Sequence, residues 1–567
     1  MDRKLRKEKN AEIQIIINDL QNSKRFLQVE TECKVWFYDS YSHALYSIEK
    51  EIFEALKNNQ QKITDFLERS DLETCTKILN FFSTINRIKE DKVPEFIQDK
   101  KCNVMINTSN RCNLNCSYCY RDKNHNNVIS IQTIDKIFTF IKTKYRPYAE
   151  EYIISYSMTS ESSIDLPILK QIAEKYINYE NYLFQKTDFH KELFTQFYKR
   201  LSSDLFYKLE THEKLPEKNI SSVISFLNNL LSFENLYELL NMNESMFEQK
   251  MLDDVRKRKI LSKWRLYRLN RWCLELSYPQ YIKNRIIPYV CFWFMTNGTC
   301  ATKEYIDFIK ACNIIPLWIS IDGPEAIHDA NRKYYDDKPS YNQIVKNIKI
   351  FHENNIPLRA SVVLTSDFPE PLTIINHLVS LGFSSFSITP IRPGSKNSFS
   401  ESNVSLLLEG YDRLYEKLKE DSIKQKFEFF RMLQEDLSLA AFNVFISRVK
   451  QLKRCSFDNQ IVIDSKGNVY PCLYFVNNDD YCYGNIYDNV NEEKIDHNSI
   501  ISLRDNCKDC WARYLCGGTC FYGSYIVTGN HLSIEPVECI IRKHLAQKCL
   551  ELLVFMREHN INIYQIY

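Results

Sequence analysis

The sequence predicts an α/β protein with a small α+β unit before the main domain and a cysteine-rich unit after it. In the middle of the chain, residues 99–395, β-rich segments alternate with amphipathic helical segments, the pattern of parallel βα units. Residues 1–98 begin instead with a candidate β-hairpin. Residues 451–567 contain closely spaced cysteines, which indicate metal binding.

Length and charge bound the possibilities. A chain of 567 residues is too long for one hydrophobic core, so we expect two to four domains. Its 74 Lys and Arg and 72 Asp and Glu give a net charge of +2, so the charge balance predicts neither a nucleic-acid nor a membrane partner. The sequence has no secretory signal and no long apolar run, so we expect a cytoplasmic protein. In that reducing compartment its 19 cysteines favour metal sites over disulfides.

The N-terminal unit is predicted to combine a hairpin with helices. Val35–Tyr38 and Ala44–Ile48 are β-rich and flank a turn-like segment. Ile52 and Leu56 then recur at helical spacing. Pro94, after a charged stretch, marks the expected boundary of this unit.

The middle unit is predicted to hold six parallel strands, whose reactive loops gather at the strands' C-terminal ends. Ile168, Leu169 and Ile172 lie at helical spacing in one of the segments between strands. Residues 180–288 interrupt the alternation and are expected to form an inserted helical subdomain, while residues 396–450 read as a helical linker. The candidate strands are Val104–Thr108, Tyr152–Met158, Tyr289–Thr296, Leu317–Ile321, Leu358–Leu364 and Ser384–Ile388.

Three cysteines follow the first candidate strand on one short loop, Cys112, Cys116 and Cys119. Three thiolates at this spacing can bind three irons of a [4Fe–4S] cluster and leave the fourth iron open to a chelating ligand. A structural zinc site would want four ligands in two paired pieces. The spacing therefore predicts a reactive cluster at the end of the first strand.

The pattern C-x3-C-x-aromatic-C after a first strand resembles the radical S-adenosylmethionine superfamily, and the resemblance covers about residues 100–395. It implies a partial (β/α)6 TIM-like barrel in which S-adenosylmethionine chelates the open iron. One electron from the cluster then breaks a carbon–sulfur bond to give methionine and a 5′-deoxyadenosyl radical. The protein would position that radical and keep water and oxygen away from it.

Further motifs follow in the order of that family. After the second strand the family usually carries Gly-Gly-Glu-Pro; this chain has Thr-Ser-Glu-Ser at 159–162, which keeps the Glu but lacks the glycines that ease close backbone approach. Thr-Asn-Gly-Thr at 296–299 matches the third-strand motif, and Ser-Ile-Asp-Gly at 320–323 resembles the fourth. The resemblance implies that S-adenosylmethionine is contacted by Tyr118, Ser160, Glu161, Asn297, Ser320 and Arg332.

The C-terminal cysteines are similar to the SPASM extension of radical enzymes that act on peptides and proteins. By that resemblance one auxiliary [4Fe–4S] cluster is held by Cys507, Cys510, Cys516 and Cys539, and a second by Cys455, Cys472 and Cys520. The fourth ligand of the second cluster is open: Cys482 is available, but its strand-like context equally favours a buried structural thiol. An open coordination site, or two zinc sites in place of the clusters, are the alternatives.

The remaining cysteines show no ligand spacing and are interpreted mostly as small buried hydrophobic residues. The general base is not assigned; Asp322, Asp329 and several tyrosines are candidates. The cysteines without ligand spacing are Cys33, Cys75, Cys102, Cys273, Cys291, Cys300, Cys312 and Cys549.

The resemblance implies a maturase that cross-links a ribosomally made precursor peptide through thioether or carbon–carbon bonds. Residues 1–98 would bind the leader of the precursor, added as a strand at the hairpin edge. A reductant such as flavodoxin or ferredoxin would supply electrons. The alternatives are an anaerobic sulfatase-maturing enzyme, which forms formylglycine, and a non-catalytic iron–sulfur binding protein.

Overall fold

The structure of the chain is a computed structural model. It describes residues 16–17, 19–20, 24–58, 70–86, 103–121, 128–144, 154–156, 161–184, 290–292, 294–312, 316–434, 436–447, 449–455, 457, 460–491, 501–562 and 566. Nearly all of the expected helical insertion, residues 180–288, lies outside the described residues. Among the described helices, none is both long and apolar enough to cross a membrane.

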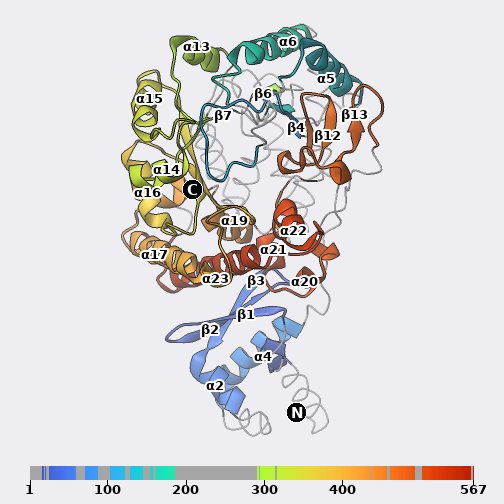
Figure 1. Ribbon diagram of the computed structural model, residues 1–567. Helices are drawn as coiled ribbons and strands as arrows, with labels where there is room; N and C mark the ends of the chain where they lie inside the picture. Colours follow the sequence, from blue (N-terminus) through green and yellow to red (C-terminus); the bar gives the residue numbers. More distant parts are fainter. Residues whose placement is uncertain are drawn as a thin grey trace.

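The described part of the N-terminal unit contains a three-stranded antiparallel sheet and the helices α2 and α4, seen in blue in Figure 1. The two expected hairpin strands are present, and a further strand, β1, pairs with β2 on its other side. Alternating apolar residues make one face of the sheet, where Val35, Phe37 and Ile48 pack with Phe53 and Phe81 from the helices. The elements are β1 (Phe26–Glu30), β2 (Lys34–Asp39), β3 (Ala44–Glu49), α2 (Lys50–Asn58) and α4 (Leu72–Asn86).

The middle of the chain forms a mixed α/β structure with parallel strands. β7, β8, β9 and β10 pair in that order, and β5 pairs with β6. The third expected strand is present as two short ones, β6 and β7. The strands are β4 (Asn103–Ile106), β5 (Ile154–Tyr156), β6 (Val290–Phe292), β7 (Met295–Thr296), β8 (Leu317–Ser320), β9 (Leu358–Leu364) and β10 (Phe386–Pro390).

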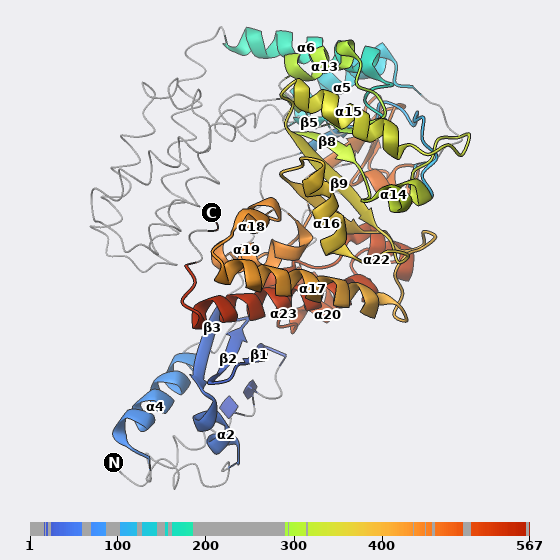
Figure 2. The same cartoon turned by 90° about the vertical axis from the view of Figure 1, so that its left-hand side faces the viewer.

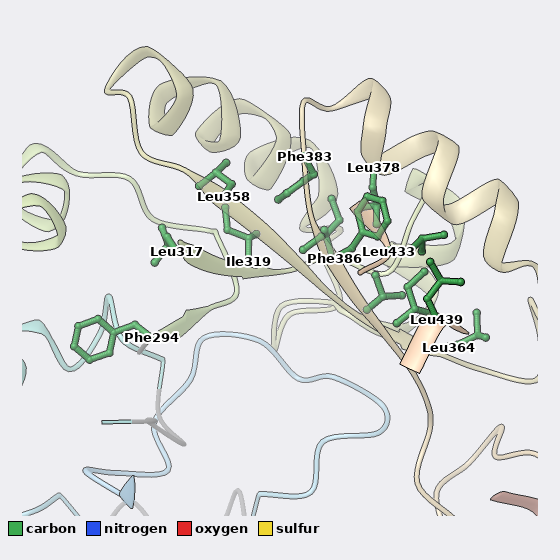
Figure 3. Packing of buried hydrophobic residues seen from close by; sticks show 14 of the residues in the cluster. Phe294, Leu317, Ile319, Leu358, Leu364, Leu378, Phe383, Phe386, Leu433 and Leu439 are labelled. Atoms are coloured by element: carbon green, nitrogen blue, oxygen red, sulfur yellow. The ribbon is translucent and has the colours of Figure 1, made fainter. Parts of the chain in front are cut away.

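Helices cover the outer face of these strands, as Figures 1 and 2 show. Figure 3 shows the core between them, where Leu317, Ile319 and Leu358 of the strands lie near Leu378 and Phe386. Along β8 and β10 buried positions alternate with half-buried ones, and the buried side chains of neighbouring strands belong to one core cluster. The helices are α5 (Ile131–Lys144), α6 (Leu166–Phe184), α13 (Lys303–Ala311), α14 (Glu325–Asn331), α15 (Tyr341–Glu353), α16 (Pro371–Ser380) and α17 (Val404–Ile423).

The C-terminal region is joined to the middle one through a shared sheet. β11 (Gln460–Ile463) pairs in parallel with β4, the strand before the first cysteine loop, and β12 (Asn468–Tyr470) and β13 (Gly484–Asn485) continue that sheet. Residues 396–450 contain α17, α18 (Glu428–Met432) and α19 (Ala440–Ser447), and their buried side chains belong to the main core.

The last helix, α23 (Pro536–Glu558), connects three parts of the molecule. It packs along α17 and α19, and its final residue accepts hydrogen bonds from the N-terminal sheet. Trp36 Nε1 and Thr31 Oγ1 donate to Glu558 Oε1 at 2.9 and 2.8 Å. The N-terminal unit therefore lies against the C-terminal helix, beneath it in Figure 1. The short helices α20 (Asp505–Lys508), α21 (Arg513–Cys516) and α22 (Phe521–Thr528) complete the region.

Candidate functional site

The first cysteine loop, Cys112–Cys119, leaves the C-terminal end of β4 and is fastened to the segment that follows α14. Asn115 N donates to Lys333 O at 2.7 Å, and Ser117 N donates to Asn331 O at 2.9 Å. Ser117 Oγ also donates to Asn331 Oδ1 at 2.9 Å. Because these bonds join distant parts of the chain, the backbone that carries the three thiols is fixed by the surrounding fold.

The Cys112 sulfur receives two N–H groups. Leu114 N lies 3.5 Å and Asn297 Nδ2 3.6 Å from Cys112 Sγ, and Asn297 Nδ2 also donates to Asn113 Oδ1 at 2.7 Å. Burial raises the pKa of Cys112 and of Cys116. The thiols must lose their protons when they bind iron, so iron binding here releases protons. Hydrogen bonds to a ligating sulfur are one of the features that set a cluster's potential.

A buried carboxylate, Asp322, holds Tyr118 of the loop and Arg332 in place. Tyr118 Oη donates to Asp322 Oδ2, which also accepts from Arg332 Nε at 3.0 Å. Val363 N donates to the other oxygen at 3.1 Å. Burial raises the pKa of Tyr118. Burial alone would lower the pKa of Arg332, but the negative charges around it, Asp322 first among them, together raise that pKa. Arg332, expected to contact S-adenosylmethionine, is thus engaged by Asp322 and stays charged.

The network around Asp322 continues to His328, whose side chain is fully buried and neutral. Burial lowers its pKa to about 4. Asp322 N approaches His328 Nδ1 at 3.3 Å, so Nδ1 is the acceptor and Nε2 carries the proton toward Ser340 Oγ, 3.0 Å away. Ser340 Oγ in turn donates to Arg332 O at 2.6 Å. His328 is therefore a structural residue of the network around Asp322.

Glu161 connects the second and third strand ends. It is buried, and its carboxylate accepts from Thr296 Oγ1 at 2.5 Å and from Asn297 N at 2.6 Å. Gly298 follows in the left-handed region at φ +75°, where a Cβ atom would come within 3.0 Å of Ile319. Asn113 Nδ2 donates to Thr299 Oγ1 at 2.9 Å, so this turn also contacts the cysteine loop.

The structure thus brings Tyr118, Glu161, Asn297 and Arg332 around the cysteine loop. Ser320 is at the C-terminal end of β8, opposite Ser361 of β9. Ser160 lies outside the described residues. All of the described members lie at or beyond the C-terminal ends of parallel strands, where the reactive loops of such folds gather.

The C-terminal cysteines fall into two groups. In the first, burial and then the neighbouring cysteines raise the pKa of Cys507 to about 12, and the thiols that act on it are Cys516, Cys510 and Cys539. Burial raises the pKa of Cys539 to about 11, with contributions from Cys516 and Cys510. These four thiols are close enough to repel one another as thiolates, which a bound cation would relieve.

The second group is Cys472 with Cys520 and Cys455. Burial, followed by the influence of the other two thiols, raises the pKa of Cys472 to about 12. Cys482 does not lie in a strand as expected, since it ends a short 3-10 helix, Asp479–Tyr481. Its thiol donates to Gly484 O at 3.5 Å and is also hydrogen-bonded to Tyr470.

Comparison with known proteins connects this geometry to a family, although no protein-family model matches the chain. The serine-type anaerobic sulfatase-maturating enzyme of Bacteroides thetaiotaomicron is 25% identical over 252 residues, 40% of this chain and 59% of that protein. The cysteine-type enzyme of Clostridium novyi is 26% identical, over 41% and 64%. The AdoMet-dependent heme synthase of Methanosarcina barkeri is 22% identical, over 44% and 73%. This chain is a homologue of anaerobic sulfatase-maturating enzymes and of an AdoMet-dependent heme synthase.

This homologue spans about three fifths of the length of the sulfatase-maturating enzymes it matches. Solved structures include anSMEcpe with bound AdoMet and Kp18Cys peptide, with a TM-score of 0.49 and 14% identity over 82% of this chain and all of that one. Another is Streptococcus suis SuiB bound to the precursor peptide SuiA, with a TM-score of 0.37 and 12% identity over 90% and 98%.

Two features of this homologue were missed from the sequence. Several arginines lie within the electrostatic influence of the C-terminal cysteines, and a tyrosine contact joins the two cysteine regions: the rings of Tyr120 and Tyr474 have centroids 4.5 Å apart. A signal existed, because Tyr120 follows Cys119 directly and Arg454 precedes Cys455. Among these arginines, Arg504 and Arg542 are buried, and Arg392 and Arg454 are half-buried.

The donor set of the first cysteine loop fits an iron–sulfur cluster. Cys112, Cys116 and Cys119 supply thiols alone, and cysteine thiolates are the ligands that hold [4Fe–4S] clusters. Three of them on one short loop are suited to a [4Fe–4S] cluster with one open iron. Within the described part of the chain, no group of three or more His, Cys, Asp or Glu side chains is arranged around one ion.

Proposed function

We propose that this protein is a radical S-adenosylmethionine enzyme that matures a ribosomally made precursor peptide by installing a thioether or carbon–carbon cross-link. The observation that supports it most is the meeting of the Cys112–Cys119 loop with Glu161, Asn297 and Arg332 at the ends of parallel strands. A [4Fe–4S] cluster on that loop would supply the electron that cleaves S-adenosylmethionine into methionine and a 5′-deoxyadenosyl radical.

The side chains around the loop have distinct tasks in this proposal. Asn297 donates toward Cys112 and holds that thiolate in place. Glu161, which already accepts a hydrogen bond from Asn297 N, would accept another from the amino group of S-adenosylmethionine. Arg332, oriented by Asp322, would attract the carboxylate of S-adenosylmethionine. Tyr118, held by Asp322, closes one side of the site and excludes water.

The peptide would be held through its leader by the N-terminal sheet. The strand order is β1-β2-β3, so β3 pairs with β2 alone among the described strands, while β1 lies near α23. A groove of about 370 Å³ runs between β3 and α4, lined by Ile48, Lys77, Asn80 and Phe81 among others. A leader strand added to β3 would gain backbone hydrogen bonds from the edge and an apolar contact with Phe81.

A second candidate, maturation of a sulfatase by oxidising a Ser or Cys to formylglycine, is favoured by the names of two relatives. That reaction does not require the N-terminal unit. The two functions therefore differ in whether residues 24–86, with their open strand edge, contribute to substrate binding.

The first test is the cleavage of S-adenosylmethionine. The anaerobically reconstituted and reduced protein should release 5′-deoxyadenosine, while a Cys112→Ala, Cys116→Ala, Cys119→Ala variant should release none. A candidate precursor should be bound with its leader and not without it. Lys77→Glu in the groove should weaken that binding, with exposed Lys57→Glu as the matched control.

Activity on a sulfatase peptide that Lys77→Glu leaves unchanged would favour the second candidate. No 5′-deoxyadenosine from fully iron-loaded protein, with or without peptide, would remove both enzymatic functions.

A further inference from the structure

A partly open cavity of about 180 Å³ lies between the end of β10 and the start of α23. Three arginines line it: Arg392 follows β10, Arg454 precedes a cysteine, and Arg542 is on α23. Among the described residues that line the cavity there is no cysteine, although Cys520 N donates to Glu538 of the lining. It is large enough for a small polar group and too small for a nucleotide.

The two carboxylates at this cavity already have partners. Glu538 Oε1 accepts from Arg542 Nε at 2.7 Å, and its other oxygen accepts from Cys520 N at 2.9 Å. Glu535 caps α23 by accepting from the N–H groups of Val537 and Glu538. Three guanidinium groups therefore face two carboxylates, and the lining has one excess positive charge.

Two of the arginines have N–H groups that make no hydrogen bond within the described part of the chain. Within the part of the chain that the structure describes, Arg392 Nε and Arg542 Nη1 are buried and find no hydrogen-bond partner. Arg542 is 9% exposed, so water from bulk solvent reaches it poorly. A buried charged donor without an acceptor costs free energy, which an anion in the cavity would recover.

The cavity is close to the first cysteine loop. The guanidinium carbon of Arg392 lies 5.5 Å from the centroid of the Tyr474 ring, and Tyr474 contacts Tyr120, the residue after Cys119. Two aromatic side chains thus separate the cavity from the candidate catalytic centre. A peptide with an acidic group in the cavity would therefore need to extend past only these two rings to reach that centre.

We propose that this cavity is an anion site that binds a carboxylate of the peptide substrate and fixes the peptide beside the radical. The inference rests on the proposed function, since it names a feature of the same substrate. A carboxylate has a single charge, which neutralises the excess of the lining, and two oxygens for the donors of Arg392 and Arg542. The acid would be an Asp or Glu side chain, or the C-terminus, of the peptide.

The rival explanation is that the arginines only offset the negative charge of auxiliary clusters. Arg392 lies within the electrostatic influence of Cys520, and Arg542 within that of Cys516. Under that explanation the positive charge is already compensated and no small anion binds. The two explanations therefore differ in a measurement that needs no substrate.

The test is calorimetric titration of the anaerobically reconstituted full-length protein with acetate, at constant ionic strength, against acetamide as the neutral isostere. Acetate should bind saturably and acetamide should not. Arg392→Gln should weaken acetate binding at least tenfold, because Arg392 is not the partner of Glu538. Exposed Arg413→Gln, whose guanidinium pairs with Glu370, should bind acetate as the parent does.

Arg392→Lys is the conservative control, because it keeps the positive charge and is less disruptive to the fold than Arg392→Gln. It removes the Nε donor, so this variant should still bind acetate more weakly than the parent. Equal heats from acetate and acetamide, or unchanged affinity in both Arg392 variants, would overturn the anion site. If the parent binds no acetate and the Arg392 variants shift the reduction potential of an auxiliary cluster, the arginines serve only to offset the charge of the clusters.

The proposed function is tested on the same preparations by 5′-deoxyadenosine release. Acetate binding in a preparation that never cleaves S-adenosylmethionine would remove the proposed function, and with it the peptide carboxylate, but leave an anion site. Cleavage without acetate binding would remove this inference alone.

Discussion

The two cysteine-bearing regions of the molecule are built in opposite ways. The first loop, Cys112–Cys119, carries its thiols on one short stretch, and the surrounding strand ends fix it through backbone hydrogen bonds. The C-terminal region collects its thiols from Cys455 to Cys539 and packs them among aromatic rings and arginines. The positions of the thiols in the first loop therefore depend on a few buried hydrogen-bonded groups. The positions of the C-terminal thiols depend on the packing of the whole region.

The largest effect should separate the two regions by function. Cys112→Ser should abolish 5′-deoxyadenosine formation, because the thiolate that anchors the candidate catalytic cluster is lost. Cys507→Ser should lower the iron content but leave cleavage of S-adenosylmethionine measurable, since it lies in the other region. Chromatographic assay of 5′-deoxyadenosine with iron analysis checks both; equal loss in the two variants would mean that the regions fold and load as one.

The next effect concerns the carboxylate beneath the first loop. Asp322→Asn should destabilise the protein by about 3–5 kcal/mol, because Arg332 would be left buried without its counter-charge. Urea unfolding measures this loss. Asp336→Asn breaks an exposed pair with Lys338 and should leave the unfolding midpoint where it was. A midpoint for Asp322→Asn that matches the parent would show that Arg332 finds another partner.

A pH effect should follow from His328 in the same network. Its pKa is lowered to about 4 in the folded state, below the ordinary 6.5, so the unfolded state binds the proton more readily. The stability from the neutral ring is present above pH 6.5 and falls as the pH drops toward 4, by about 2 kcal/mol between pH 8 and pH 5. Unfolding of His328→Gln across that range should show a shallower slope than the parent; identical slopes would contradict the assignment.

The smallest effect should come from Cys482. Since its thiol bonds Gly484 O, Cys482→Ala should keep the iron content of the parent and cost less than about 1 kcal/mol in stability. Iron analysis and the spectra of the reduced auxiliary clusters check this. Loss of iron equivalent to one cluster would instead make Cys482 the fourth ligand of the Cys455, Cys472 and Cys520 group.

Much of the fold could be predicted from the sequence because its signals are local. The strand Leu358–Leu364 has the predicted bounds, since apolar residues recur at every second position from Leu358 to Leu364, the spacing of one face of a strand. The pairing of β11 with β4 could not be predicted, because it joins strands far apart in the chain and neither carries a signal for its partner. β1 was missed because Phe26–Glu30 mixes polar and apolar residues without a strict alternation.

The candidate site divides in the same way. The spacing of Cys112, Cys116 and Cys119 is visible in the sequence, and so is the resemblance of the motifs around Glu161 and Asn297. The role of Asp322 as a shared acceptor for Tyr118, Arg332 and a strand amide is not, because it depends on how three strand ends converge. The burial of Arg504 and Arg542 could not be predicted either, since Arg is mostly exposed in proteins and only the packing reveals an exception.

The length of α23 sets a distance that a substrate would have to match. One end of this 23-residue helix carries Cys539 near the auxiliary cysteines, and the other end holds the N-terminal sheet through Glu558. At the rise of an α-helix the two ends are about 34 Å apart. A peptide gripped at the sheet and processed beyond the far end of α23 would need about ten extended residues between the two places. The length of α23 would thus favour precursors in which the leader and the residue to be modified are separated by at least that number of residues.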